Sequence, residues 1–428
     1  MSPPPPPRRD PVAGWLQVLA LAVALLAWGL GGDGPARLDH DLAYRPWFVH
    51  RPGVWPVTLG AAALFALGGW WAAGRRAEPT APDRSWLLAA PLALAGWALR
   101  PRQPGGDYPG FADLAVEAAG PGASPWAHPT EPGASLLHGL VAGQAWRLDP
   151  ALLRDGFELP SSVAGLVGLA WVLGRGQHLT HGRPLAWLAL WLPTGLAAVW
   201  WGDAELYAWP MALTVGMLVE GSRAPASRRS AAMAPVLWGL VVSLHLLGLL
   251  LAPAALLVLA GSARRREGRA LLAAVAGLAA AAAWTAALLA VAGVTPTSIA
   301  ETLSLTGTRL AWRQAGEAGP AVRLDAFALL LPWALGALLA GRPPHLRDPV
   351  DRLLLVAGLG PALIAVAGRS TLAAGGDWNL WAFCLVPLGL LLARRLLGPD
   401  GAPRWSIAAW SAFAALSVAP WILARALR

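Results

Sequence analysis

The sequence predicts an all-α integral membrane protein that crosses the bilayer about thirteen times. Hydrophobic residues make up 56% of the 428-residue chain, charged residues only 13%, and the mean hydropathy is +0.50. Apolar segments of about 20 residues, the length that a helix needs to cross a bilayer, recur along the chain. Short arginine clusters separate these segments. A soluble fold cannot bury so much apolar surface, so the soluble class is excluded.

The predicted spans alternate in direction from an N terminus in the cytoplasm. Each inner loop then holds a cluster of arginines, whereas most of the acids fall on the outer side. The first span follows a proline tract and lacks a convincing signal-peptidase site, so we expect it to stay uncleaved. The spans are predicted at residues 12–30, 54–73, 84–99, 159–174, 184–201, 204–220, 232–245, 246–261, 270–292, 322–341, 351–368, 378–396 and 405–426.

One stretch, residues 232–261, decides the number of spans. A single long helix would place the arginine cluster 264–266 on the outer side. A hairpin that turns near Ser243-Leu244-His245 keeps this cluster inside, in agreement with the other arginine clusters. Each arm is short for a full span, so we expect a tilted or partly re-entrant hairpin.

Two predicted outer segments, residues 100–158 and 293–323, are too long to be turns. Long connections in an otherwise compact protein are functional or disordered. The first contains amphipathic stretches at residues 111–119 and 133–146, which we expect to be short helices on the membrane surface. This long first outer loop is therefore the main departure from a bundle with tight connections.

The net charge of +9 does not indicate a nucleic-acid partner. All 33 basic residues are arginines, and their clusters between apolar segments are explained by membrane topology. Abundant alanine, glycine, proline, arginine and tryptophan without lysine is typical of a high-GC bacterial genome. We therefore expect a multi-pass protein of the bacterial inner membrane, in contact with membrane lipids.

Ionisable residues from distant parts of the chain gather at the outer ends of the predicted spans. Such residues at membrane depth are costly and indicate function. Acids beside arginines suit an anionic lipid-phosphate ligand, because acids can act as base or metal ligand and arginines can bind phosphate. The candidates are Asp107 in the first outer loop, Asp203 and Glu205 in a short turn, His245 at the hairpin tip, Arg309 and Arg313 in the second long loop, and Asp377 before a late span.

Each candidate also has a structural alternative. Asp203 or Asp377 can cap the helix that follows, and Glu205 can stabilise a helix N-terminus. Asp107 can be an ordinary loop acid, and His245 a hydrogen-bonded packing residue. The two arginines can meet lipid headgroups alone. These alternatives stay open at the level of sequence.

No cofactor is assigned, although a divalent metal is possible. Asp107, Asp203, Glu205 and Asp377 are the possible metal ligands. His128 and His138 flank Glu131 without the tight spacing of a metal site, and the single Cys384 lies in an apolar run without a CxxC pair.

Five short motifs occur together along the chain: Gly106-Asp107, Glu131-Pro132 followed by Leu136-Leu137-His138, the turn Gly202-Asp203-Ala204-Glu205-Leu206-Tyr207, the hairpin His245, Gly248 and Pro253, and Gly376-Asp377-Trp378-Asn379-Leu380. Through these motifs the chain resembles the GT-C superfamily of polyprenyl-phosphate-sugar-dependent membrane glycosyltransferases, in its bacterial branch related to protein mannosyltransferases. The resemblance covers residues 85–396. It departs from the family at Asn379, which stands where a second acid is expected in the late motif.

The resemblance implies three parts and a reaction. Residues 1–84 are a tail with two extra spans, residues 85–396 the catalytic core, and residues 397–428 a last span. A polyprenyl-phosphate-linked sugar would be the donor. By the family's pattern Asp107 is the catalytic base, which would activate an acceptor hydroxyl on the outer face. The resemblance leaves the acceptor unassigned.

The implied binding roles go to the other candidates. Arg309 or Arg313 would bind the donor phosphate, while Asp203, Glu205 and Asp377 would position the sugar or a metal, with His245 also at the substrate. Two other function classes compete with transfer. A secondary transporter predicts broken helices and charges near the bilayer midplane, and a lipid-binding or assembly protein would need no catalysis.

Overall fold

The computed structural model describes residues 55–75, 84–100, 108–121, 128, 130–201, 206–291, 293–295, 297, 330–340, 345–367, 378–398 and 402–427. Within these ranges the chain is helical and contains no β-strand beyond one isolated bridge between His128 and Glu131. The all-α class predicted from hydropathy is confirmed.

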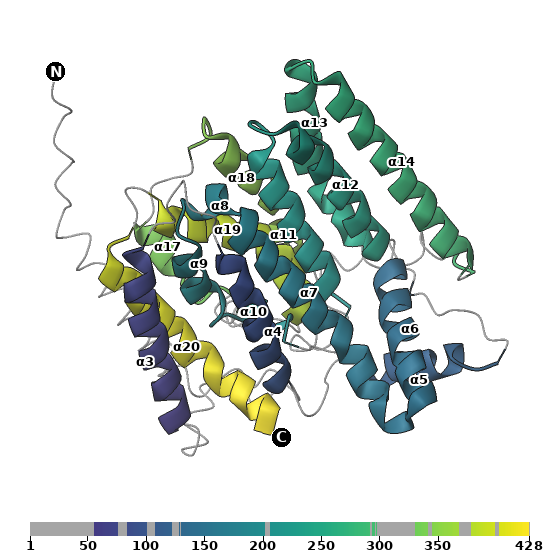
Figure 1. The fold of residues 1–428 in the computed structure, drawn as a ribbon, viewed down its shortest axis with the longest axis horizontal. Helices are drawn as coiled ribbons and strands as arrows, with labels where there is room; N and C mark the ends of the chain where they lie inside the picture. Colours follow the sequence, from purple (N-terminus) through teal and green to yellow (C-terminus); the bar gives the residue numbers. More distant parts are fainter. Residues whose placement is uncertain are drawn as a thin grey trace.

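The helices form one elongated bundle with a smaller helical group at one corner (Figure 1). The described helices are α3 (Trp55–Ala73), η2 (Ser85–Leu88), α4 (Ala89–Ala98), α5 (Tyr108–Ala118), α6 (Pro132–Leu148), η3 (Pro150–Leu152), α7 (Leu153–Arg175), α8 (Gln177–Thr180), α9 (Pro184–Trp191), α10 (Gly195–Ala198), α11 (Ala208–Arg223), α12 (Arg228–Leu244), η4 (Leu246–Leu251), α13 (Ala252–Arg264), α14 (Gly268–Val291), α17 (Ala334–Ala340), α18 (Pro349–Ala367), α19 (Trp378–Leu397) and α20 (Arg404–Leu427).

Several described helices have the length and hydropathy of membrane spans. Those that satisfy both measures over at least 18 residues are Pro56–Ala73, Pro150–Arg175, Leu246–Arg264 and Gly268–Val291. Large apolar side chains on α3, such as Leu64 and Leu67, are about 70% exposed, as suits a helix that faces lipid (71% and 68%). The protein is therefore a multi-pass membrane protein, and the number of thirteen spans stays a prediction.

The hairpin predicted within residues 232–261 is present. α12 ends at Leu244, His245 adopts an extended conformation, and η4 and α13 return alongside α12. The indole N–H of Trp238 donates to the carbonyl of Gly248 at 2.8 Å and fastens the two arms. Because the chain reverses here, the arginines at the end of α13 lie at the same end of the bundle as the start of α12 (Figure 1).

The span predicted as one helix over residues 184–201 is broken, which corrects the prediction. α9 ends at Trp191, and Thr194 begins α10 in an extended conformation with its side chain capping the new turn. Pro193 at the break lacks an N–H and cannot continue the hydrogen-bonded ladder. Hydropathy alone does not register this break, because both pieces are apolar. α11 likewise begins at Ala208, four residues later than predicted.

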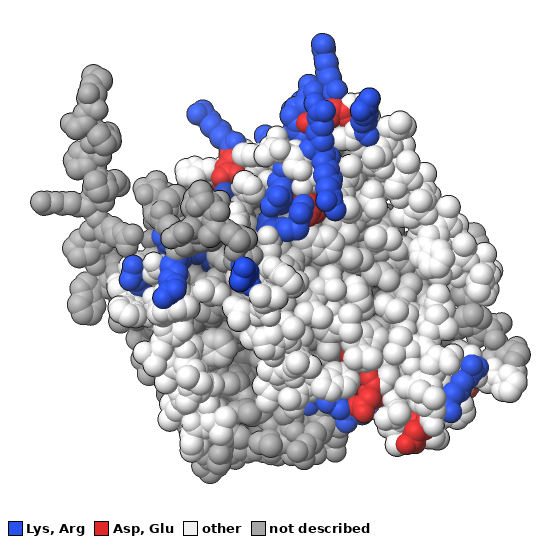
Figure 2. Space-filling model, in the orientation of Figure 1, with Lys and Arg blue, Asp and Glu red and all other residues white. Residues whose placement is uncertain are grey.

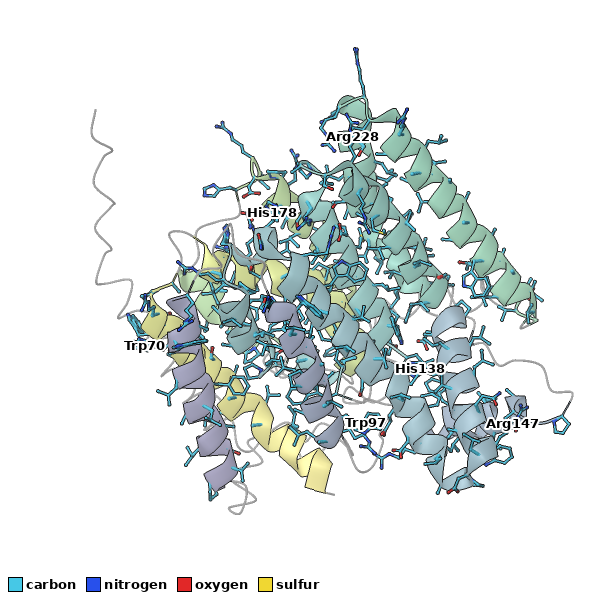
Figure 3. All side chains as sticks on the ribbon, in the orientation of Figure 1. Trp70, Trp97, His138, Arg147, His178 and Arg228 are labelled. Atoms are coloured by element: carbon cyan, nitrogen blue, oxygen red, sulfur yellow. The ribbon has the colours of Figure 1, made fainter. Side chains whose placement is uncertain are left out.

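Arginines gather at one end of the bundle and a smaller group of charges at the other (Figure 2). Figure 3 labels Arg228 and His178 toward the first end, and Trp97 and Arg147 toward the second. Loops predicted to share the inner side are joined here: Arg265 donates to the carbonyl of Ala224 at 3.0 Å, and Arg223 to that of Arg175 at 3.2 Å. The alternating topology requires this grouping, while the orientation of the N terminus stays a prediction.

The first and last described helices pack against one another. α3 lies along α20 over most of its length, and Gly69 approaches the Ser411 side chain closely enough that a Cβ would lie 2.9 Å from its Oγ. The two parts predicted to flank the core are thus in contact. The division at residues 84 and 396 stays a prediction.

A separate small core holds together the group at the corner of the bundle. We call this group the outer module, after the loop that is predicted to lie on the outer side, and define it as α5, α6 and residues 153–157 of α7. Its core consists of Phe111, Ala115, Ala134, Ala142, Phe157 and Leu206. α5 and α6 match the amphipathic stretches predicted as short helices, and α6 packs along the first turns of α7. The module is tied to the bundle at Arg100, whose guanidinium lies 2.6 Å from Asp155 and 3.0 Å from Glu158.

Candidate functional site

The structure describes one of the seven predicted site residues, His245. Its six companions lie outside the described residues: Asp107, Asp203, Glu205, Arg309, Arg313 and Asp377. The site is therefore built from His245 and from the described segments that adjoin these six in the sequence.

His245 lies at the tip of the hairpin, where the backbone leaves the α12 helix. Its φ and ψ of −150° and 122° are extended, so its side chain turns out of the helix and caps η4. The Nδ1 atom accepts the N–H of Leu247 at 3.1 Å. A ring nitrogen that accepts a hydrogen bond carries no proton, so the imidazole proton is on Nε2.

The protonated Nε2 of His245 faces a buried carboxylate. It lies 3.2 Å from Oε1 of Glu131, with side-chain exposures of 3% and 9%. The contact is within ion-pair distance, although its angle departs from that of a hydrogen bond. Because the carboxylate is charged and dehydrated, even a bent N–H···O⁻ contact stabilises this arrangement.

Two aromatic side chains enclose the His245 ring. Its centroid lies 5.2 Å from that of Tyr207, which precedes α11. Phe383 of α19 stacks on the ring at 5.6 Å with an interplanar angle of 11°. The hairpin tip is thus held by residues from three separate parts of the chain.

Glu131 stands immediately before α6, and Pro132 is the first residue of that helix. Proline at the first turn of a helix loses no hydrogen bond, which explains why the helix begins here. Burial by itself would raise the pKa of Glu131. The close contact with His245, with smaller effects of His128 and Tyr207, outweighs burial and lowers that pKa. Glu131 is therefore ionised at neutral pH.

Backbone contacts join the loop before α6 to the hairpin. The N–H of Leu246 donates to the carbonyl of Thr130 at 2.8 Å. Gly133 lies so close to the end of α12 that a Cβ would come within 2.6 Å of the carbonyl oxygen of Ser243. A side chain there would push the outer module away from the bundle. Glu131 and His245 meet because these backbones touch.

The two histidines that flank Glu131 have other partners. His128 Nδ1 lies 2.9 Å from Thr130 Oγ1, and His138 Nδ1 donates to the carbonyl of Phe157 at 2.8 Å. Burial lowers the pKa of His138 to about 4, so this imidazole is neutral at pH 7. Figure 3 shows His138 in the region between α6 and α7. Among the described residues, no three metal-binding side chains gather into a metal site.

Segments that adjoin three of the predicted acids meet at this place. Phe111, four residues after Asp107, lies 6.4 Å from His128 between ring centroids. Leu206 and Tyr207 follow Glu205 directly, and they contact the outer-module core and His245 respectively. Phe383 follows Asp377 by six residues and stacks on His245. The described structure thus brings together the first outer loop, the short turn, the hairpin and the start of α19.

Sequence reasoning missed the partners of His245. Glu131 was noted only for its flanking histidines and as part of a family motif, and Phe383 not at all. Their separation in the sequence leaves no spacing that could link them. The available signal was local: an acid directly before a helix-starting proline, in the loop predicted to be functional.

The folded protein should lose stability at acidic pH because Glu131 becomes protonated. A carboxyl whose pKa is lower in the folded state than its ordinary 4.5 contributes stability above that value, and the contribution disappears as the pH falls through the folded-state pKa. We expect the melting temperature of the wild type to fall more steeply below about pH 4.5 than that of Glu131→Gln. Tryptophan fluorescence melts from pH 7 to pH 3 measure this.

The comparison of slopes isolates Glu131. Burial lowers the folded-state pKa of His138 to about 4, so His138 destabilises both proteins as the pH falls below its ordinary value of 6.5. The charge of Glu131 raises that pKa, so the loss from His138 is larger in Glu131→Gln and does not produce a steeper fall in the wild type. Equal slopes for the wild type and Glu131→Gln below pH 4.5 would show that the carboxylate is not stabilised as described.

Comparison with solved structures identifies the fold. ArnT from Cupriavidus metallidurans, bound to undecaprenyl phosphate, aligns over 72% of this chain with a TM-score of 0.51 and 15% sequence identity. The chain shares the fold of ArnT. The alignment spans 59% of the length of ArnT, and the apo form of ArnT aligns at a TM-score of 0.49 and 16% identity.

The shared fold agrees with the GT-C resemblance of the sequence motifs. This likeness is one of fold, and it does not single out the protein-mannosyltransferase branch. No family model matches the sequence. No curated protein matches it either.

Proposed function

We propose that the chain is an integral membrane glycosyltransferase that moves a sugar from a polyprenyl-phosphate donor to an acceptor on the outer face of the membrane. The observation that carries this proposal is the meeting of the outer-loop segments at the Glu131–His245 contact, in the fold of ArnT. ArnT, which shares the fold, binds undecaprenyl phosphate. A polyprenyl phosphate also suits the site proposed here, because its anionic head would lie at the membrane surface while its long apolar tail stays in the bilayer.

The proposed reaction is a single displacement. Asp107 removes the proton from an acceptor hydroxyl, and the hydroxyl oxygen attacks the anomeric carbon. The bond from that carbon to the phosphate oxygen breaks, and polyprenyl phosphate leaves with the bonding electrons. Attack from the face opposite the leaving group inverts the anomeric configuration.

The other predicted residues bind the donor in this proposal. Arg309 or Arg313 neutralises the phosphate, whose charge grows as the glycosidic bond breaks. Asp203, Glu205 and Asp377 position the sugar or hold a divalent metal. Substrate contact by His245 stays a prediction, since Nδ1 binds Leu247 and Nε2 faces Glu131. We propose that the Glu131–His245 contact positions the segments that carry these acids.

The charges of the described structure favour surface chemistry over transport. Its buried ionisable side chains lie toward the ends of the bundle: Glu131, His138, Glu158 and His245 in or beside the outer module, and Glu220, Asp351 and Arg394 toward the opposite end. A transporter of the predicted kind would place such groups near the midplane between paired broken helices. Reaction at the outer surface needs neither feature.

Donor cleavage is the direct test of this function. Membranes that contain the full chain are incubated with a panel of polyprenyl-phosphate sugars and native lysate as a source of acceptor, and released polyprenyl phosphate is measured. We expect at least one donor to release more polyprenyl phosphate in membranes that contain the chain than in membranes that lack it. Absence of release from every donor, with the protein present and folded, would reject catalysis and leave transport or lipid binding.

A further inference from the structure

Six arginines form an exposed edge at the end of the bundle opposite the outer module. We call them the arginine edge: Arg228, Arg229, Arg264, Arg265, Arg266 and Arg269. They come from the start of α12, the end of α13 and the start of α14, and one acid, Glu267, lies among them. Figure 2 shows this concentration of positive charge at the top of the molecule, where basic side chains project from the surface.

Contacts within the chain place the two halves of the arginine edge on one surface. Arg265 pairs with Glu267 at 3.0 Å and also donates to the carbonyl of Ala224, just before α12. Arg228 lies close enough to Glu267 to lower the pKa of that carboxyl, after the larger effect of Arg265. The start of α12 and the turn between α13 and α14 therefore share their electrostatic field.

Most of these arginines have no partner among the described residues. The side chains of Arg229, Arg264, Arg266 and Arg269 form neither a hydrogen bond nor an ion pair with any part of the chain that the structure describes. Other arginines at the same end are used internally, as Arg175 is by Glu220 at 2.5 Å. Like charges held together without internal partners repel one another, so an external anion would relieve that repulsion.

An apolar surface begins directly beyond the arginine edge. Leu272, one turn along α14 from Arg269, is 71% exposed. Leu256 of α13 and Val275 of α14 are exposed as well (58% and 52%). A ligand that bridges the two surfaces must carry a negative head and apolar chains, which is the chemistry of an anionic lipid.

We propose that the arginine edge binds the phosphate headgroup of an anionic phospholipid whose acyl chains lie along α13 and α14. Arginine forks bind phosphate oxygens through pairs of hydrogen bonds, and clustered basic residues next to a membrane span attract anionic headgroups. The site lies at the opposite end from the outer module, so it is independent of the proposed glycosyl transfer. The bound lipid stabilises the α12–α14 region, and salt weakens it.

A lipid titration tests this site. The full chain is purified in a neutral detergent, and its melting temperature is followed by tryptophan fluorescence. Short-chain phosphatidylglycerol, short-chain phosphatidylcholine and inorganic phosphate are added separately. Three proteins are compared: the wild type, the quadruple variant Arg229→Gln/Arg264→Gln/Arg266→Gln/Arg269→Gln, and the control Arg347→Gln/Arg352→Gln, which removes two exposed arginines elsewhere at the same end.

The proposal expects phosphatidylglycerol alone to raise the melting temperature of the wild type and the control, and the quadruple variant to lose most of that shift. Equal shifts in the quadruple variant and the wild type would overturn it. Equal shifts with phosphatidylcholine would reject the role of charge, and equal shifts with inorganic phosphate would reject a lipid. If the quadruple variant does not fold, Arg264→Gln/Arg266→Gln replaces it and must lose about half of the shift.

Discussion

Asp107→Asn is expected to lower the release of polyprenyl phosphate by roughly 100- to 10,000-fold. The amide keeps the shape of the carboxylate but cannot take a proton from the acceptor hydroxyl. Because the substitution leaves donor binding in place, the loss should fall on turnover, with little change in the donor concentration for half-maximal rate. Rates are measured in membranes with matched protein levels.

Asp113→Asn is the matched control for this experiment. Asp113 is an exposed acid on α5, six residues further along the same outer loop, and its substitution removes the same charge. We expect its rate to stay within about twofold of the wild type. Full activity of Asp107→Asn at normal expression would show that Asp107 is not the base.

Arg394→Met is expected to destabilise the folded protein by about 3–5 kcal/mol. The guanidinium of Arg394 lies 2.7 Å from both Asp348 and Asp351, and it also donates to the carbonyl of His178. Methionine fills a similar volume but leaves the Asp351 carboxylate, whose side chain is only 10% exposed, without its cation. Removing one partner of a buried pair costs far more than the pair contributes.

Thermal or denaturant unfolding in detergent measures this loss. Arg352→Met removes an exposed arginine from the neighbouring α18 and should shift the midpoint little. Adding Asp351→Asn to Arg394→Met should restore part of the stability, because the uncompensated charge is then gone. A midpoint for Arg394→Met equal to that of Arg352→Met would contradict the buried cluster.

Local pattern was enough to predict much of the fold. Hydropathy located α3, α14, α18, α19 and α20 to within a few residues, and amphipathic periodicity located α5 and α6. The arginine cluster after α13 fixed the hairpin at His245, because only a reversal keeps that cluster with the others. Each of these signals is carried by residues that are near one another in the sequence.

Such local signals do not predict tertiary contacts. The break between α9 and α10 depends on Pro193 and on the cap by Thr194 inside a run that is apolar throughout. The contact of His245 with Glu131 depends on the packing of Gly133 against α12, and Arg394 of α19 pairs with acids just before and at the start of α18. Which distant polar residues pair is decided by packing, and one sequence does not reveal that packing.

In the proposed site, acids from distant segments lie together on the outer side beside Glu131 and His245. Cross-linking tests it without knowledge of the donor, because Cys384 is the chain's single cysteine and can be replaced. In a Cys384→Ala background, Asp107→Cys is paired with Asp203→Cys or Asp377→Cys and treated with a short bis-maleimide in membranes. Asp107→Cys with Arg269→Cys, at the opposite end, is the control.

We predict that both acid-derived pairs cross-link and that the control pair does not. After a protease cut between the two positions, the two fragments of a cross-linked protein stay joined. Absence of cross-links in both acid-derived pairs, with each cysteine shown to react singly with a monofunctional maleimide, would contradict a shared site.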